Sequence, residues 1–417
     1  MARIAFAWEL GSELGHSMAC NALAQNLHAR GHRIAFIFRE LHQLAYLDAI
    51  SAFEVFQAPV SVSEGHGLPV PSSFADILVG CGYDHPDHLA GLLGGWLALF
   101  QRWKPDLVVA DFSPTALLAA RVLGLRRVAF GNGFSIPPRL NPLPPFRFDE
   151  PVSAEHVKAS DARVLASVNA TLARFGVPPL STLAQQFETD EDFLATFPEL
   201  DAYGNRPKAG YWGPRFSVDQ GVSVPWPAGT GKRVLMYLKK NQPQLDALIE
   251  AFAQGPHRLA AFIPDLEPSR RERLRGPSRF VSEQPMRLAP LLEECDLFIS
   301  QGGNVSVGTL MSGVPQLVLP TQYEQYLTAQ RMEQLGTGLW LGVEAKPAEV
   351  SAALERVLRD PAFTVAAKAY ARRYSAYSAR EGQRRIAVRI EEILAQPAHT
   401  RALPQPAPAS TGSRITP

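Results

Sequence analysis

The feature that most constrains the fold is an alternation of short apolar runs with helix-like segments, which occurs in both halves of the 417 residues. The first half contains the runs "RIAFAW", "RIAFIF", "LVVAD" and "RVAFG", and the second half contains "RVLMYL", "RLAAFI", "LFIS" and "QLVLP". Continuous apolar strands separated by amphipathic helices, of which residues 19–30 are one example, are typical of parallel sheets covered on both faces. We therefore predict an α/β protein with two doubly wound parallel sheets.

The length of the chain also favours two domains, because it exceeds what one hydrophobic core usually serves. The stretch from Tyr211 to Lys232 is rich in Pro and Gly and lacks a periodic pattern, so we expect the linker there. A continuous helical pattern runs from Tyr370 to Ala395, and a proline-rich polar tail follows it. The expected order is an N-terminal domain (1–213), a linker (214–231), a C-terminal domain (232–375), a helix crossing back to the N-terminal domain (376–396) and a disordered tail (397–417).

The charge balance argues against two classes of partner. The net charge is +1, so no global field draws the chain to nucleic acid or to an anionic membrane. The longest apolar stretch, residues 89–100, is too short to span a bilayer, and we predict a buried helix there, with a membrane-surface contact as the alternative. The first strand-like run begins at Arg3, so we expect no signal peptide. These features predict a soluble, cytoplasmic protein with no integral membrane segment.

The three cysteines, Cys20, Cys81 and Cys295, lie far apart and have no metal-type spacing. This pattern indicates buried thiols in a reducing compartment. Asp and His residues are not grouped at ligand spacing either, so we expect no metal site.

The first strand leads into the sequence "ELGSELGHSMAC", which places a glycine turn and His16 at its exit. Ligands of doubly wound sheets bind beyond the carboxyl ends of the strands, so we expect chemistry there. The pKa of an imidazole is about 6.5, which suits a general base, and a helix-capping histidine is the alternative. The spacing from Gly11 to Gly15 differs from G-x-G-x-x-G, which argues against a dehydrogenase. His32, in the turn before the second strand, is expected to be structural.

Asp111 ends the run "LVVAD" and precedes a helix that begins near Pro114. It therefore lies at the same edge of the sheet as His16. A carboxylate there can accept the other ring N–H of His16, fix its tautomer and stabilise the imidazolium. The alternative is helix N-capping, for which Ser113 competes. The pairing with His16 favours a catalytic role.

The second half carries a glycine turn, "QGGNVS", directly after the strand that ends at Ser300. Residues 305–311 are expected to be helical. A glycine turn that enters a helix offers free N–H groups and the positive end of the helix dipole to an anion. Ser306 adds a hydroxyl, and Lys239 and Lys240, after the first strand of this domain, add charge. We interpret the turn as a diphosphate site.

Glu324 and Gln325 follow the next strand, "QLVLP". A carboxylate and a carboxamide together accept and donate hydrogen bonds, which suits the recognition of vicinal hydroxyls. The alternative is a solvated pair on the first turn of a helix. Because the glycine turn and this pair follow adjacent strands, we favour a nucleotide-sugar as the ligand.

Taken together, "GxxxGH" after the first strand, Asp111, and "GVP" followed by "P-x-x-x-E-Q" resemble the glycosyltransferases of the GT-B fold. The pattern is most similar to the UDP-glycosyltransferase-like family, glycosyltransferase family 1, in its bacterial branch. The resemblance covers residues 3–394 and is strongest over residues 280–338. It implies two Rossmann-like domains that face a cleft, and an inverting, metal-independent hexosyltransferase.

The resemblance implies roles for individual residues. His16 deprotonates the acceptor hydroxyl and Asp111 supports it, while Glu324 and Gln325 bind sugar hydroxyls. The other donor-binding residues it implies are Lys239, Ser282, Gln301, Gly302, Gly303, Asn304, Val305 and Ser306. Acceptor contacts are expected from Gly15, Phe134 and Ile136, with residues 65–88 and 135–148 lining the acceptor pocket. The apolar side chains of these segments favour a small lipidic or aromatic acceptor.

The sequence departs from the family at two positions. Relatives commonly carry a histidine at the diphosphate turn, where this chain reads "SQGGNVS", so Gln301, Asn304 or the backbone alone must supply the donors. Met286 stands where many relatives carry Gln. We expect a UDP- or dTDP-sugar as co-substrate and no cofactor. The alternatives are a sugar-nucleotide epimerase of the same fold and a non-catalytic partner that activates another glycosyltransferase.

Overall fold

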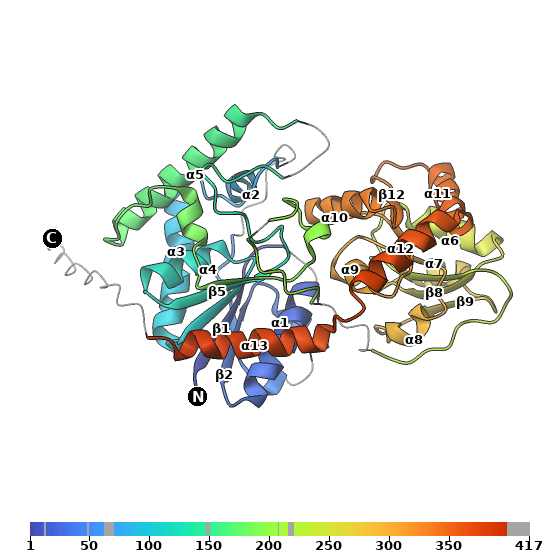
Figure 1. Ribbon diagram of the computed structural model, residues 1–417, viewed down its shortest axis with the longest axis horizontal. Helices are drawn as coiled ribbons and strands as arrows, with labels where there is room; N and C mark the ends of the chain where they lie inside the picture. Colours follow the sequence, from blue (N-terminus) through green and yellow to red (C-terminus); the bar gives the residue numbers. More distant parts are fainter. Residues whose placement is uncertain are drawn as a thin grey trace, which may run out of the picture. The chain divides into compact units, whose positions relative to one another are not determined.

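The computed structural model describes seven stretches of the chain: residues 1–11, 14–47, 50–61, 71–146, 151–206, 208–215 and 221–397. The chain forms two compact units, which Figure 1 shows in the colours of the sequence. Unit 1 comprises Met1–Gly131, Ser135–Phe193 and the chain from Ala387, and unit 2 comprises Asn132–Phe134 and Leu194–Ile386. Parts of the expected features lie outside the described residues: Ser12 and Glu13 of the first turn, residues 65–70 and 147–148 of the expected acceptor segments, residues 216–220 of the linker, and the tail from residue 398.

Unit 1 contains a six-stranded sheet in the order β3-β2-β1-β4-β5-β6. Its strands are β1 (Arg3–Trp8), β2 (Arg33–Phe38), β3 (Glu54–Gln57), β4 (Leu107–Asp111), β5 (Arg126–Gly131) and β6 (Glu191–Leu194). β1 pairs in parallel with both β2 and β4, so the strand order reverses between β1 and β4. In doubly wound sheets the ligand site lies outside the carboxyl ends of the strands at this reversal.

The helices of unit 1 cover a sheet whose central strands are almost entirely buried. Every residue of β4 is buried, as are five of the six residues of β1, which is the pattern of a parallel sheet enclosed on both faces. The helices are α1 (Leu14–Ala29), α2 (Phe74–Gly80), α3 (Pro86–Trp103), α4 (Pro114–Val122) and α5 (Ala154–Arg174), with short 3-10 turns at Leu41–Tyr46, Ile50–Ala52 and Leu183–Phe187. The expected buried helix at residues 89–100 is confirmed as the middle of α3.

Unit 2 repeats the topology, with the strand order β12-β11-β10-β7-β8-β9. Its strands are β7 (Arg233–Tyr237), β8 (Arg258–Phe262), β9 (Arg279–Ser282), β10 (Leu297–Ser300), β11 (Gln316–Val318) and β12 (Gly338–Trp340). β7 pairs in parallel with both β8 and β10, so the order reverses between β7 and β10. The predicted fold class, two doubly wound parallel sheets, is confirmed.

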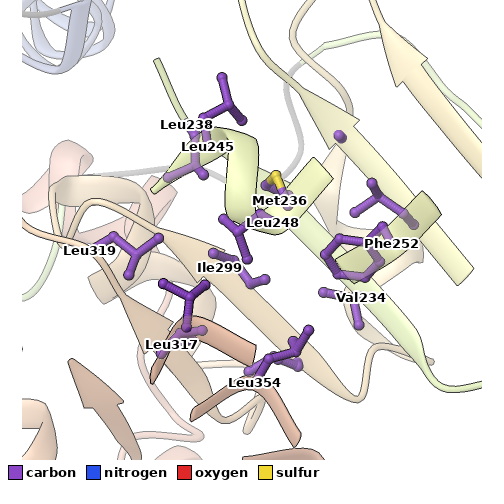
Figure 2. Close-up of a cluster of buried hydrophobic side chains, with 14 of the residues drawn as sticks. Val234, Met236, Leu238, Leu245, Leu248, Phe252, Ile299, Leu317, Leu319 and Leu354 are labelled. Carbon is purple, nitrogen blue, oxygen red and sulfur yellow. The ribbon is translucent and has the colours of Figure 1, made fainter. Parts of the chain in front are cut away.

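The core of unit 2 lies between the sheet and the helices α6 (Leu245–Gln254) and α11 (Pro347–Arg359), as Figure 2 shows. Phe252 and Leu248 of α6 pack against Val234 and Ile299 of the sheet in this cluster. The other helices of unit 2 are α7 (Pro268–Arg273), α8 (Leu288–Leu292), α9 (Asn304–Leu310), α10 (Tyr323–Gln334) and α12 (Pro361–Arg373), with a 3-10 turn at Pro198–Leu200. Helix α13 (Ala379–Ala395) begins in unit 2 and belongs to unit 1 from Ala387. Burial of these apolar side chains is the main favourable term in folding the unit.

The prediction for the C-terminal helix was wrong in one respect. The sequence predicted a continuous helix from Tyr370 to Ala395, whereas α12 ends at Arg373 and α13 begins at Ala379. The aromatic residues between them explain the break: the ring of Tyr374 stacks on Phe197 at a centroid distance of 3.7 Å, and Tyr377 meets the same ring edge-on. Both rings therefore pack against Phe197 within unit 2, and the backbone between the two helices forms turns instead of a continuous helix.

The remaining structural expectations concern His32 and the membrane. His32 precedes β2, accepts a hydrogen bond from the backbone N–H of Ala2 and lies 3.2 Å from the carboxylate of Glu391 in α13, so its predicted structural role is confirmed. Within the seven described stretches, every helix is too short or too polar to cross a membrane.

Candidate active site

His16 and Asp111 lie together at the carboxyl edge of the sheet in unit 1. The last residue of β4 is Asp111, which lies opposite Trp8 in the neighbouring strand β1, and His16 is the third residue of α1. The imidazole Nδ1 is 3.1 Å from the carboxylate Oδ2. His16 is 8% exposed and Asp111 is completely buried, so the interaction is shielded from bulk water. The structure thus brings together the two residues that the sequence paired.

The surroundings of the imidazole fix its orientation. The indole of Trp8 stacks on the ring of His16 at a centroid distance of 5.2 Å and an interplanar angle of 18°. Because Nδ1 faces Asp111, Nε2 is the ring nitrogen that lies away from this carboxylate. A Cβ atom at Gly11, whose φ is +76°, would lie 3.0 Å from this Nε2. The glycine therefore provides the turn and also keeps the space beside Nε2 open.

The helix-capping alternatives do not describe these two residues. The N-cap position of α4 is occupied by Ser113, and Asp111 lies two residues before it. His16 lies inside α1, after the N-cap position. Phe112, between Asp111 and the cap, has a φ of +46°, which is uncommon for a residue with a side chain. Strained backbone of this kind concentrates at functional sites.

Glu9 is a buried residue of the same edge that the sequence analysis missed. It follows β1, and its carboxylate accepts hydrogen bonds from the backbone N–H of Thr115 at 2.9 Å, from the Ser113 hydroxyl at 3.3 Å and from the Tyr83 hydroxyl at 3.3 Å. The Thr115 hydroxyl donates to it as well. Burial raises the pKa of the Glu9 carboxyl to about 7, although these hydrogen bonds lower it. Its position directly after a central strand was the signal available in the sequence.

The glycine turn of unit 2 lies at the reversal of the second sheet, directly after β10. Gly302 has a φ of +92°, and a Cβ there would lie 2.9 Å from the carbonyl oxygen of Gln325, so only glycine fits. Ser306 is buried, and its hydroxyl bonds to that of Ser300. The expected helix is present as α9, but its seven residues limit the dipole that it offers to an anion.

The side chain of Gln301 points into the unit. Its Nε2 lies 3.0 Å from Oε1 of Gln242 and 3.2 Å from Oγ1 of Thr321. Gly303 is the N-cap of α9, and Asn304 and Val305 begin that helix. The structure therefore brings the predicted residues 301–306 to one turn. The amide of Gln301, however, is directed towards Gln242 and Thr321.

Other predicted donor-binding residues lie after neighbouring strands of unit 2. Lys239 is in the turn after β7, the strand that pairs with β10. Ser282 ends β9, the edge strand, and its hydroxyl donates to the carbonyl of Gln284 at 2.6 Å. Met286 is buried, and its backbone N–H donates to the hydroxyl of Tyr237.

Glu324 and Gln325 occupy the first turn of α10. Gln325 is 3% exposed, and its Oε1 accepts hydrogen bonds from the backbone N–H of Thr321 at 3.0 Å and from the Thr321 hydroxyl at 3.3 Å. A solvated glutamine is therefore the wrong description of this residue. Glu324 accepts a hydrogen bond from Nδ2 of Asn132, which belongs to unit 2. Asn132 was missed because 192 positions separate it from Glu324 in the sequence.

A buried ion pair holds the loop that carries Asn132. Nε of Arg206 lies 2.9 Å from Oδ2 of Asp201, which is completely buried, and Nη2 of the same arginine donates to the carbonyl of Gly133 at 2.9 Å. The Tyr211 hydroxyl also donates to Asp201. Because Gly133 is adjacent to Asn132, this network fixes the backbone from which Asn132 reaches Glu324.

The predicted acceptor residues are in different places. Gly15 precedes His16 in α1. Phe134 belongs to unit 2 and Ile136 to unit 1, and both side chains are buried.

Among the described residues, no group of three or more His, Cys, Asp and Glu side chains is placed to hold a metal ion. The thiols of Cys81 and Cys295 each have a pKa raised to about 12 by burial.

Comparisons with known sequences match parts of the chain. Residues 256–393 match the family model described as erythromycin biosynthesis protein CIII-like, C-terminal domain. The chain is 44% identical over 69 residues to the NDP-glycosyltransferase YjiC of Bacillus subtilis strain 168, and 36% identical over 78 residues to the YjiC of Bacillus licheniformis. These matches cover 16% and 18% of this chain, and they span about a fifth of the length of the curated relatives.

Solved structures match nearly the whole chain. The glycotransferase of kitacinnamycin superimposes with a TM-score of 0.68 at 23% identity, covering 94% of this chain and 99% of that one. The calicheamicin glycosyltransferase CalG4 gives a TM-score of 0.67 at 20% identity, covering 95% and 99%. The glycosyltransferase VinC, solved in complex with dTDP, gives 0.66 at 16% identity, covering 93% and 100%. The chain therefore has the fold of these solved glycosyltransferases, GT-B, with two doubly wound sheets, and its residues 256–393 are similar to the erythromycin-CIII-like C-terminal domain.

Proposed function

We propose that the protein transfers a sugar from a nucleoside-diphosphate sugar to a hydroxyl group of a small acceptor, with inversion at the anomeric carbon. The observation that carries this proposal is the buried pair of His16 and Asp111 at the carboxyl edge of β1 and β4, with 3.1 Å between Nδ1 and Oδ2. A carboxylate that holds an imidazole in this way leaves Nε2 basic and oriented. This arrangement suits proton removal from a hydroxyl.

In this mechanism Nε2 of His16 takes the proton of the acceptor hydroxyl as its oxygen attacks the anomeric carbon of the donor. Asp111 stabilises the imidazolium that forms, because a buried carboxylate interacts strongly with a nearby positive charge. General-base catalysis of this kind contributes about a hundredfold to ten-thousandfold in rate. The stacked indole of Trp8 keeps the ring from rotating away from the carboxylate.

The donor is assigned to unit 2. Glu324 and Gln325 would bind sugar hydroxyls, since a carboxylate accepts hydrogen bonds and a carboxamide also donates them. Residues 302–306 of the turn and Lys239 would meet the diphosphate, and Ser282 would lie against the base. VinC was solved with dTDP and the glycosyltransferase SsfS6 with thymidine diphosphate, which supports a UDP- or dTDP-sugar as the donor. The proposed displacement uses these side chains and requires neither a metal ion nor a cofactor.

The experiment that tests the proposal is an acceptor screen. UDP- and dTDP-sugars are incubated with the protein and a panel of lipidic and aromatic alcohols, and the products are detected by mass spectrometry. We expect a glycosylated acceptor together with free nucleoside diphosphate. Consumption of donor in the absence of acceptor would instead indicate an epimerase or a hydrolase. Absence of any binding of UDP or dTDP in a calorimetric titration would indicate a non-catalytic partner and would refute the proposal.

A further inference from the structure

A chain of glutamine side chains connects the glycine turn of unit 2 with Gln325. Nε2 of Gln301 donates to Oε1 of Gln242 at 3.0 Å and to Oγ1 of Thr321 at 3.2 Å. The backbone N–H and the hydroxyl of Thr321 both approach Oε1 of Gln325, at 3.0 and 3.3 Å. Gln301, Gln242 and Gln325 are all buried, whereas Thr321 is exposed.

Backbone groups at both ends fix the direction of these hydrogen bonds. Nε2 of Gln242 donates to the carbonyl of Leu319 at 3.3 Å and to Oε1 of Gln244, whose own Nε2 donates to the carbonyl of Gly342. A carbonyl only accepts and a backbone N–H only donates, so no amide in the series can be reversed without leaving like groups face to face. The oxygen of Gln325 must therefore face Thr321, and the amino group of the Gln325 carboxamide is directed away from it.

This network uses both N–H groups of Gln301. A carboxamide has two N–H groups, and those of Gln301 are donated to Gln242 and Thr321. A diphosphate could receive one of them only if the hydrogen bond to Gln242 or the one to Thr321 were broken. The position at which relatives commonly carry a histidine is therefore poorly suited to donate to a diphosphate in this chain.

The backbone of the turn contacts Gln325 as well. Gly302 approaches the carbonyl of Gln325 so closely that a Cβ would lie 2.9 Å from the oxygen and also 2.9 Å from Cγ1 of Val318. The glycine turn therefore approaches the first turn of α10 through the backbone of Gly302, and the side chain of Gln301 contacts Thr321, just before α10. A displacement of Gln301 would therefore change the position of Gln325.

We propose that Gln301 is a positioning residue, which acts through Thr321 to hold the Gln325 carboxamide with its N–H groups presented to a sugar hydroxyl. This inference rests on the proposed function and names the end of the donor on which Gln301 acts: the sugar, not the diphosphate. Gln242 and Gln244 complete the network by fixing the polarity of the Gln301 amide.

The test compares the affinities of sugar nucleotides with those of the bare nucleotides. UDP, dTDP, UDP-glucose and dTDP-glucose are titrated by calorimetry into the wild-type protein and into Gln301→Met and Thr321→Val. We expect the affinity for UDP and dTDP to stay within about twofold, and the affinity for the sugar nucleotides to fall relative to it by about 3- to 10-fold, the usual worth of a hydrogen bond. Thr321→Ser, which keeps the hydroxyl, should retain the wild-type ratio.

Two further variants separate positioning from a general loss of structure. Thr337→Val removes a buried hydroxyl of the same unit that donates to the carbonyl of Met332, and it should leave the ratio unchanged. In a Gln325→Ala background, Thr321→Val should have no further effect on the ratio, because the residue through which it acts is gone.

The contradicting results are distinct. An equal fall in the affinities for bare and sugar nucleotides would show that Gln301 acts on the diphosphate and would overturn the inference. An unchanged ratio in Gln301→Met, or full additivity with Gln325→Ala, would overturn it too while leaving the proposed function intact. If the wild-type protein bound none of the four nucleotides, the proposed function would fall and the inference with it.

Discussion

Replacement of Glu9 by Gln should remove a pH dependence of stability that the wild-type protein carries in unit 1. Glu9 is buried and accepts hydrogen bonds from Ser113, Thr115 and Tyr83. Gln has nearly the same shape, and its oxygen can accept from the Thr115 N–H while the flanking hydroxyls rotate to accept from its amino group. The variant therefore resembles the protonated carboxyl group and has no proton to lose.

The magnitude follows from the raised pKa of Glu9, which shifts from 4.5 to about 7 on burial. Between these two values the folded state holds a proton that the unfolded state has released, so stability falls as the pH rises. The contribution of this bound proton to the free energy of unfolding is complete below about pH 4.5 and is lost as the pH rises through about 7. At about 1.4 kcal/mol for each pKa unit, the wild-type protein should lose about 2.5 kcal/mol relative to Glu9→Gln between about pH 5 and about pH 8.

The assay is urea unfolding of both proteins at several pH values, with the difference in free energy of unfolding taken at each pH so that groups common to both cancel. Among the groups that face Glu9, the Tyr83 hydroxyl and the Cys81 thiol have pKa values raised by burial, and both titrate far above this range. Glu155→Gln, at an exposed position of α5, is the control and should show no such trend. A difference that is constant with pH, or that grows in favour of the wild type as the pH rises, would refute the reasoning.

Three further predictions follow from the site and the core. Gly11→Ala should lower transfer at least about tenfold, because the new Cβ would lie 3.0 Å from Nε2 of His16 on backbone of positive φ, and steady-state rates measure it. Asn132→Ala should lower kcat/KM for the donor about tenfold in steady-state assays, since the Glu324 carboxylate loses a hydrogen bond, while thermal unfolding should show an unchanged Tm. Phe197→Ala should destabilise unit 2 by about 3–5 kcal/mol in urea unfolding, because it empties an aromatic stack.

The sequence predicted the central strands of both sheets and missed the strands at the edges. The missed strands are β3, β6, β9 and β12, and these are the four edge strands of the two sheets. A central parallel strand is buried on both faces and therefore reads as a continuous apolar run, whereas an edge strand is partly exposed and tolerates charge. β3 reads "EVFQ" and β6 reads "EDFL", and neither has a recognisable apolar pattern.

The candidate site was predictable where it depends on topology. The side chains of His16 and Asp111 could be paired because both follow central strands at the same edge of one sheet, and this edge follows from the strand order. The contacts of Asn132 with Glu324 and of Gln301 with Gln242 depend on how loops fold in three dimensions, and no spacing in the sequence indicates them. For the same reason the sequence did not predict that both N–H groups of Gln301 are already donated.

The most direct test of the central claim, that His16 is the general base held by Asp111, is the rate of sugar transfer by His16→Ala with the affinity for the nucleoside diphosphate measured on the same sample. The dyad lies in unit 1 and the proposed nucleotide residues lie in unit 2, so the affinity should remain within about twofold of the wild type. The account predicts that transfer falls by about a hundredfold or more. Wild-type transfer by His16→Ala, with the nucleotide bound as before, would contradict it.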